Sequence, residues 1–169
     1  MNQKTRILGI DPGSRITGVG LVDVYGDRLV LVHWARIQTN GDHISRLRQI
    51  FGEITKVVKF HCPDEIAIER VFVHRNVDSA LKLGQARAAA LVATFDADLP
   101  VYEYAARYVK KSVAGQGNAS KLQVQHMVKV LLGVSEEIQS DAADALAVAL
   151  CHAHSRHAQT VIAKVAAQT

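Results

Sequence analysis

The chain has 169 residues, of which 49% are apolar and 21% charged, so its composition is that of one globular domain with its own core and not of a disordered chain. The longest apolar run, residues 88–95, is far too short to span a bilayer, and the first residues lack the pattern of a signal peptide. We therefore expect a cytoplasmic protein, and its net charge of +4 is compatible with an anionic partner without requiring one.

Three strands separated by tight turns are predicted at the start of the chain. The first covers residues 5–10 and ends at Asp11, where Pro-Gly-Ser supplies turn chemistry. The second covers 17–24 and the third 28–37, and connections this short make the three strands antiparallel neighbours. Alternation along the third strand places Leu29, Leu31 and His33 on one side and Val30, Val32 and Trp34 on the other.

Helical spacing of apolar residues begins after the third strand. Residues 44–58 carry one apolar stripe, and Cys62-Pro63 ends this helix. A short buried strand at 66–68 ends at Glu69. The remaining predicted elements are a helix that begins at Asn76 or Asp78 and runs to about Asp96, a strand over 100–104, a basic helix, a helix over 119–132, and a last helix from about 140 to 157.

This order of elements predicts an α/β domain. Three antiparallel strands followed by strand–helix–strand crossovers give one mixed five-stranded sheet with helices on both faces. Residues 1–157 are expected to form this single domain, and residues 158–169 a flexible C-terminal tail.

The cysteines and a histidine cluster do not have the spacing of a metal site. Cys62 and Cys151 are predicted to be buried free thiols. His152, His154 and His157 are predicted to lie on a solvated helix end, because positions two apart on a helix face different directions.

Basic residues gather in two segments of the chain. Between Glu103 and Glu136 there is no acidic residue, and residues 70–87 hold four cationic side chains against Asp78. Either these segments are solvated surfaces or they bind a polyanion such as DNA. The cationic residues of the two segments are Arg70, Arg75, Lys82, Arg87, Arg107, Lys110, Lys111, Lys121 and Lys129.

Four carboxylates stand out by their position. Asp11 and Glu69 each follow a strand, and in a sheet with crossovers ligands bind beyond the carboxyl ends of such strands. Asp141 and Asp144 are three residues apart at the start of the last helix, so they share a face. Taken singly, each has an ordinary role in a turn, at a solvated strand end or at a helix N-terminus.

Convergence of these four groups requires compensation. Two carboxylates about 4 Å apart repel by roughly 4 kcal/mol at an effective dielectric constant of 20. Oxygen-only ligands suit Mg²⁺ or Mn²⁺, and two such ions can activate a water and stabilise the leaving oxygen in phosphodiester cleavage. The pattern therefore favours a metal-dependent nuclease over a solvated acidic surface.

Six motifs lie in register between about residues 6 and 154. They are ILGIDPGS at 7–14 with Thr17-Gly18, AIERVF at 67–72, SALKLGQAR at 79–87, YAAR at 104–107, QVQHM at 123–127 and DAADALA at 141–147. Together they resemble the RuvC family of bacterial Holliday junction resolvases. The opening motif also occurs in other ribonuclease-H-like and phosphate-binding folds, whereas the third and last motifs are highly specific.

The resemblance implies a ribonuclease-H-like fold, a homodimer, and Mg²⁺-dependent paired nicking of a four-way DNA junction in recombination and repair, with two ions per site and Mn²⁺ as a substitute. A branch-migration helicase complex is an implied partner. The helix from 78 to 95 is the candidate dimer seam through Leu81, Gly84, Ala88 and Leu91.

By position, Asp11, Glu69, Asp141 and Asp144 match the family's metal-binding catalytic carboxylates, Lys110 and Lys121 its basic residues beside the active site, and Phe72 its base-stacking aromatic residue.

Further candidate DNA-binding residues are Arg70, Arg75, Lys82, Arg107 and Lys111. Arg70 follows Glu69 directly, where it either contacts a phosphate or lowers the pKa of that carboxyl.

Three alternatives stay open from the sequence. A phosphate-transfer or ATPase module would use the Asp-Pro-Gly-Ser turn, but such modules need a second domain for which this length leaves no room. A non-catalytic DNA-structure binder would bind a junction without nicking it. A ribonuclease-H-like nuclease acting on RNA or a hybrid would be separated by comparing cleavage of a junction, a linear duplex and an RNA–DNA hybrid.

Overall fold

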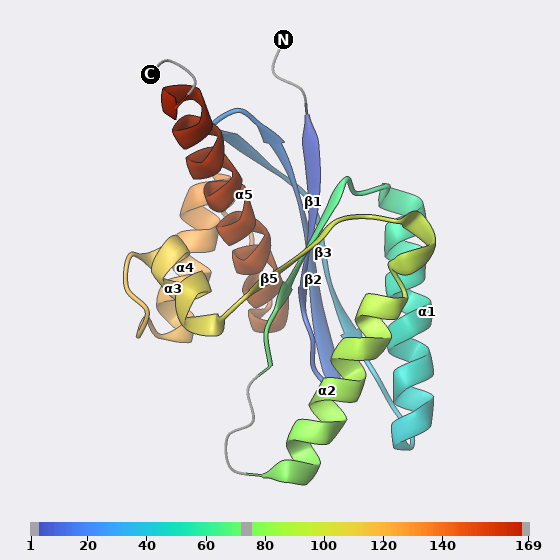
Figure 1. Cartoon of the computed structure of the whole chain (residues 1–169). Helices are drawn as coiled ribbons and strands as arrows, with labels where there is room; N and C mark the ends of the chain where they lie inside the picture. The colour runs from blue at the N-terminus through green and yellow to red at the C-terminus, as the bar shows by residue number, and fades with distance from the viewer. Residues whose placement is uncertain (1–3, 72–75, 167–169) are drawn as a thin grey trace.

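In a computed structural model of the protein, which describes residues 4–71 and 76–166, the strands form one sheet in the order β3-β2-β1-β4-β5 (Figure 1). The pairs β1–β2 and β2–β3 are antiparallel, whereas β1–β4 and β4–β5 are parallel. The predicted mixed sheet is confirmed. Its strands are β1 (Thr5–Asp11), β2 (Ile16–Tyr25), β3 (Arg28–Gln38), β4 (Glu65–Glu69) and β5 (Val101–Tyr104).

Helices cover both faces of this sheet. The helices are α1 (His43–His61), α2 (Val77–Val92), α3 (Ala106–Ala114), α4 (Lys121–Leu132) and α5 (Ser140–Ala166), with a 3₁₀ turn, η1 (Phe95–Ala97), after α2. Figure 1 shows α1 and α2 on one face and α3, α4 and α5 on the other. Within the described residues, no helix is long and apolar enough to cross a membrane.

Two helix boundaries differ from the predicted ones. The helix that begins after the Asn76 cap ends at Val92, and the chain tightens into η1 before Asp98, which adopts a left-handed conformation with φ 48°. At the other boundary, α5 continues past His157 to Ala166. The division into a domain of residues 1–157 and a tail of 158–169 stays a prediction.

Alternation along the central strands divides the core into two layers. Ile7 and Ala67 pack with α5, whereas Leu8, Ile10 and Ile68 pack with α1 and α2. Successive strand side chains point to opposite faces. The residues that end β1 and β4 therefore point to the face covered by α5.

A β-bulge in β3 corrects one predicted face assignment. The register changes from Leu21↔His33 to Val22↔Leu31, so that Val32 is the extra residue. Beyond an extra residue the two faces exchange. Trp34 therefore packs on the same layer as Leu31, and not with Val32 as alternation predicted.

Glycines in β1 and β2 let α5 lie against the sheet backbone. A Cβ atom at Gly18 would lie 1.9 Å from the carbonyl oxygen of Asp141, and one at Gly9 would lie 2.1 Å from that of Ala145. Since these neighbours are backbone atoms, only glycine allows the observed spacing. The first turns of α5 are thereby placed directly over the end of β1.

Two predicted exposures are wrong. Cys151 is buried, but Cys62, which caps α1 in a left-handed conformation with φ 47°, is exposed. His152 is 1% exposed because α5 is covered by β4 and β5 at this position. Its Nε2 lies 2.6 Å from Glu65 Oε2, and its Nδ1 lies 2.7 Å from the Tyr104 hydroxyl.

Candidate active site

Asp11 and Glu69 end two adjacent parallel strands. Ile10 of β1 is in register with Ile68 of β4, and each carboxylate follows its member of that pair. Parallel neighbours lie about 4.8 Å apart. Strand register alone therefore brings the two carboxylates, which are 58 positions apart in the sequence, to the same edge of the sheet.

Three helices complete this edge. α5 contributes Asp144 from its second turn, and α3 contributes Lys110. α4 begins at Lys121, where Ser120 and Gln123 form a capping box that fixes the start of the helix. The Nζ atom of Lys121 lies 3.1 Å from Asp144 Oδ2.

These side chains line one cavity of about 260 Å³. Its walls are completed by apolar residues of α3, α4 and α5. Five residues that the sequence predicted for the active site line this cavity: Asp11, Glu69, Asp144, Lys110 and Lys121.

Asp141 lies beside this cavity without lining it. Its Oδ2 is 3.1 Å from Nε of Arg36, which projects from β3. It is still close enough for its charge to act on Asp11. Of the four predicted carboxylates, three therefore line the cavity, and Asp141 is held at its rim.

The pKa values of the two strand-end carboxyls are perturbed. Burial raises the pKa of Asp11 to about 8, with further increases from the charges of Glu69 and Asp144 that Lys121 partly offsets. Burial and the charge of Asp144 also raise the pKa of Glu69, whereas the charges of Lys110 and Lys121 lower it. Carboxyls that repel one another in this way are stabilised by protons or by cations.

The donor set of the cavity fits a hard divalent cation in its chemistry. Its acidic ligands are carboxylate oxygens, which Mg²⁺ and Mn²⁺ prefer. In the described part of the chain, however, no three His, Cys, Asp or Glu side chains are grouped so as to hold a metal ion. Asp144 and Asp141 are instead paired with Lys121 and Arg36.

The other predicted DNA-binding residues are distributed around this site. Arg70 lies 3.6 Å from Glu103 of β5, and the raised pKa of Glu69 does not support a role for Arg70 in lowering it. Lys82 pairs with Asp78 on α2. Arg107 and Lys111 are exposed on α3, and Phe72 and Arg75 lie outside the described residues.

Two supporting arginines were not predicted from the sequence. Arg36 holds Asp141, and Nε of Arg87 donates to the backbone oxygen of Glu69 at 3.2 Å. The role of Arg36 could have been inferred from strand register, because Arg36 pairs with Gly18, which in turn pairs with Asp11. A cation within an apolar strand, two strands from a carboxylate, is a candidate partner for that site.

Comparison with known proteins gives a consistent family. The family described as "Crossover junction endodeoxyribonuclease RuvC" matches residues 7–152. A relative of that name from Shewanella sp. (strain W3-18-1) is 52% identical over 158 residues, which cover 93% of this chain and 90% of that one. Another, from Pelobacter propionicus, is 54% identical over 154 residues, covering 90% and 88%.

A solved structure agrees with the sequence relatives. The structure described as "T. thermophilus RuvC in complex with Holliday junction substrate" superimposes with a TM-score of 0.85 at 37% identity, covering 92% of this chain and 97% of that one. The fold, the carboxylate-lined cavity at the sheet edge and these matches lead to one conclusion: the chain belongs to the RuvC family of crossover junction endodeoxyribonucleases.

Proposed function

We propose that this protein is a Holliday junction resolvase, a DNA endonuclease that makes paired symmetric nicks in a four-way junction during recombination and repair. One observation carries the proposal: Asp11, Glu69 and Asp144, from three separate elements, line one cavity together with Lys110 and Lys121. The relatives named as crossover junction endodeoxyribonucleases support the reaction, and the junction-bound structure supports the substrate.

The four carboxylates Asp11, Glu69, Asp141 and Asp144 are proposed to hold divalent cations, two Mg²⁺ ions per site, with Mn²⁺ able to replace them. Such ions supply Lewis acidity and lower the pKa of a water that attacks phosphorus. The chain's own part is to place the scissile phosphate. Lys121 donates hydrogen bonds to its oxygens, and Lys110 offsets the negative charge of Glu69.

The test of this function is a Mg²⁺ titration of nicking on a synthetic junction. We expect two symmetric nicks in the junction, with far slower cleavage of a linear duplex of the same sequence and of an RNA–DNA hybrid. Junction binding without nicking at any Mg²⁺ concentration would contradict the proposal, and preference for the hybrid would assign the site to a different nuclease.

Replacing Lys121 by Ala is expected to slow nicking about 100-fold, because one donor to the developing charge is typically worth this much. Junction affinity should fall by at most about 10-fold, which is the effect of one lost phosphate contact at about 0.1 M salt. Single-turnover nicking and equilibrium binding measure the two effects separately. Lys129→Ala, at the other end of the same helix, is the control, and equal losses in rate and affinity would make Lys121 a plain phosphate contact.

Metal affinity is expected to depend on pH through Asp11. Because the pKa of this carboxyl is raised to about 8, a cation must displace its proton at lower pH. The apparent Mg²⁺ dissociation constant should therefore rise by about tenfold for each unit below pH 8. Calorimetry in two buffers of different ionisation enthalpy should show about one proton released at pH 6.5 and few above pH 8.5; proton-independent binding would contradict the assignment.

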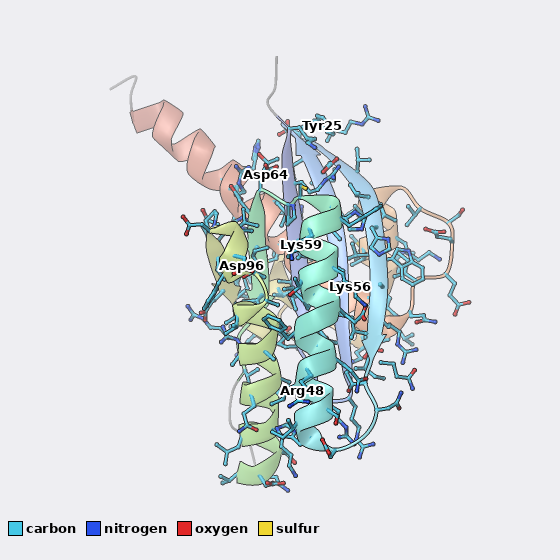
Figure 2. The ribbon with its side chains drawn as sticks, turned by 90° about the vertical axis from the view of Figure 1, so that its right-hand side faces the viewer. Tyr25, Arg48, Lys56, Lys59, Asp64 and Asp96 are labelled. Atoms are coloured by element: carbon cyan, nitrogen blue, oxygen red, sulfur yellow. The ribbon has the colours of Figure 1, made fainter. Side chains whose placement is uncertain are left out.

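A homodimer is proposed to form through α2. Apolar residues recur along its exposed side at helical spacing, and part of them line a groove of about 480 Å³ with Phe51 of α1. Of the predicted seam, Leu81, Gly84 and Ala88 are exposed, whereas Leu91 packs into the chain's own core. Figure 2 shows α1 and α2 side by side on this face of the molecule.

A second copy is the occupant that the reaction favours, because an isologous two-fold pair presents two equivalent sites to a junction that is cut twice. We expect Leu81→Lys to produce a monomer in sedimentation experiments and to uncouple the two nicks. Val130→Lys introduces the same charge at an exposed apolar position of α4 and should stay dimeric. A dimeric Leu81→Lys variant would move the interface elsewhere.

The remaining predicted contacts follow from the same function. Phe72 is proposed to stack on bases near the crossover, and Arg70, Arg75, Lys82, Arg107 and Lys111 to contact the DNA backbone. A branch-migration helicase complex is the proposed partner and the cytoplasm the proposed location.

A further inference from the structure

A second, strongly polar pocket lies at the same end of the sheet as the candidate active site. It has a volume of about 460 Å³ and is enclosed by the turn after β1 and the first turns of α1 and α2. Figure 1 shows that both helices begin at the end of the sheet where β1 ends. Each of the three segments contributes one cation: Arg15, Arg46 and Lys82.

Positive charge in this pocket is only partly compensated. Its carboxylate, Asp78, lies 2.6 Å from Lys82 Nζ, while no described carboxylate pairs with Arg15 or Arg46. The positive charges of Arg15 and Arg46 therefore face this polar pocket without a compensating carboxylate. An anion with oxygen acceptors is the ligand chemistry that this arrangement fits.

Two buried polar atoms in the pocket also lack a partner. Among the described residues, neither Nε of Arg46 nor Nδ1 of His43 has a hydrogen-bond partner, although both atoms are shielded from solvent. Leaving such a group unpaired costs about 1–3 kcal/mol, so these atoms are expected to be satisfied by a ligand. The Nε–H of Arg46 is a donor that a phosphate oxygen can accept, while Nε2 of His43 is already hydrogen-bonded to Oε1 of Gln85.

We propose that this pocket binds a backbone phosphodiester of the DNA strand that crosses the active site, a few nucleotides from the cut. Ser14, which lines the pocket, is three residues after Asp11, so their Cα atoms are at most about 10 Å apart. Because the axial rise of DNA is about 3.4 Å per nucleotide, this distance spans at most about three nucleotides. A contact at this distance fixes the register of the strand and thereby the phosphate that enters the cavity. The inference rests on the proposed nuclease function, because it requires DNA at this edge.

The test combines a charge-neutralising variant with a charge-neutralised substrate. Arg46→Gln and Lys82→Gln are expected to weaken junction binding about 5- to 10-fold at about 0.1 M salt and to reduce the slope of log affinity against log salt by about one. Arg28→Gln makes the same change in the hairpin at the far end of the sheet and should leave affinity within twofold of the unmodified protein. Because Lys82 is exposed, its variant remains informative even where Arg46→Gln fails to fold.

A scan of single methylphosphonates within about three nucleotides of the cut then locates the phosphate. One such substitution should reproduce the loss of Arg46→Gln with the unmodified protein and add nothing with the variant. Equal affinity for Arg46→Gln and Arg28→Gln, or a methylphosphonate loss that is the same in both proteins, would overturn the proposal.

Two further outcomes separate the sources of the anion and the two proposals. In the first, millimolar inorganic phosphate stabilises the unmodified protein but not Arg46→Gln, and the two proteins bind the junction equally well. This result would assign the pocket to a free anion and overturn the DNA contact. Absence of Mg²⁺-dependent nicking by the unmodified protein would instead refute the nuclease function, whereas normal nicking with unaffected binding by Arg46→Gln would refute the pocket alone.

Discussion

Replacing Asp11 by Asn is expected to reduce junction nicking at least about 10³-fold while junction affinity stays the same or increases. Metal-assisted charge stabilisation is worth several kcal/mol in the transition state, and each 1.36 kcal/mol is a factor of ten in rate. Binding persists because the DNA contacts come from the surrounding cations, and Asn at position 11 brings no negative charge near the polyanion. Single-turnover nicking and filter binding on the same junction measure the two quantities.

The matched control for this substitution is Asp27→Asn. Asp27 lies in the hairpin at the opposite end of the sheet, and its side chain is 85% exposed, so the same chemical change there should leave both quantities unaltered. Near-normal nicking by Asp11→Asn and by a second variant, Glu69→Gln, would refute the site assignment. Loss of binding in parallel with nicking would show that these carboxyls serve the fold and not the reaction.

The same variant has a consequence for stability. Because the pKa of Asp11 in the folded protein is about 8, above its value in an unfolded chain, the metal-free protein loses stability as pH rises from about 4 to 8. Asn mimics the protonated carboxyl and removes this loss. In a chelator at about pH 8, Asp11→Asn should therefore be more stable by up to about 5 kcal/mol, since the pKa shift covers about four units at about 1.36 kcal/mol each. This raises the melting temperature by about 10–20 °C, and the gap should narrow at about pH 5. A gap that widens on acidification would contradict the raised pKa.

Local patterns were sufficient to predict the order of the elements and half of the site. Tight turns make the first three strands antiparallel neighbours. The crossover from β3 through α1 then makes β4 parallel to β1. Once that pairing is known, Asp11 and Glu69 must meet at one edge, because both directly follow their strands' last buried residues. The role of the glycines of β1 and β2 could not be predicted in this way, because it depends on which helix crosses them.

The features that were missed depend on contacts between distant segments. The bulge at Val32 arises from pairing with β2 and leaves no mark in the alternation of β3 itself. Helical spacing placed Asp141 and Asp144 on one face, but Arg36 from the sheet draws Asp141 to the rim of the cavity. His152 looked like part of a solvated helix end because its partners, Glu65 and Tyr104, lie 87 and 48 positions away.

Gly18→Ala is expected to damage both the fold and the site. The added methyl carbon would meet the Asp141 carbonyl oxygen at 1.9 Å, and since that atom belongs to the helix backbone, the first turn of α5 must move away from β2. Overpacking of this kind costs about 3 kcal/mol, which corresponds to a fall of about 6–12 °C in melting temperature. Moving α5 also moves Asp141 and Asp144 relative to Asp11, which is paired with Gly18, and a displacement of about 1 Å can cost about 100-fold in rate.

Gly52→Ala is the matched control, because a Cβ atom at this position in α1 would have no neighbour within 4 Å. There the same substitution should stabilise the protein by about 0.5–1 kcal/mol through the higher helix propensity of alanine, with normal nicking. The decisive comparison is the rate of nicking below the melting transition, where both variants are folded. If Gly18→Ala melted and nicked like Gly52→Ala, α5 would not be held against the sheet backbone, and the placement of its two aspartates over the end of β1 would lose its physical basis.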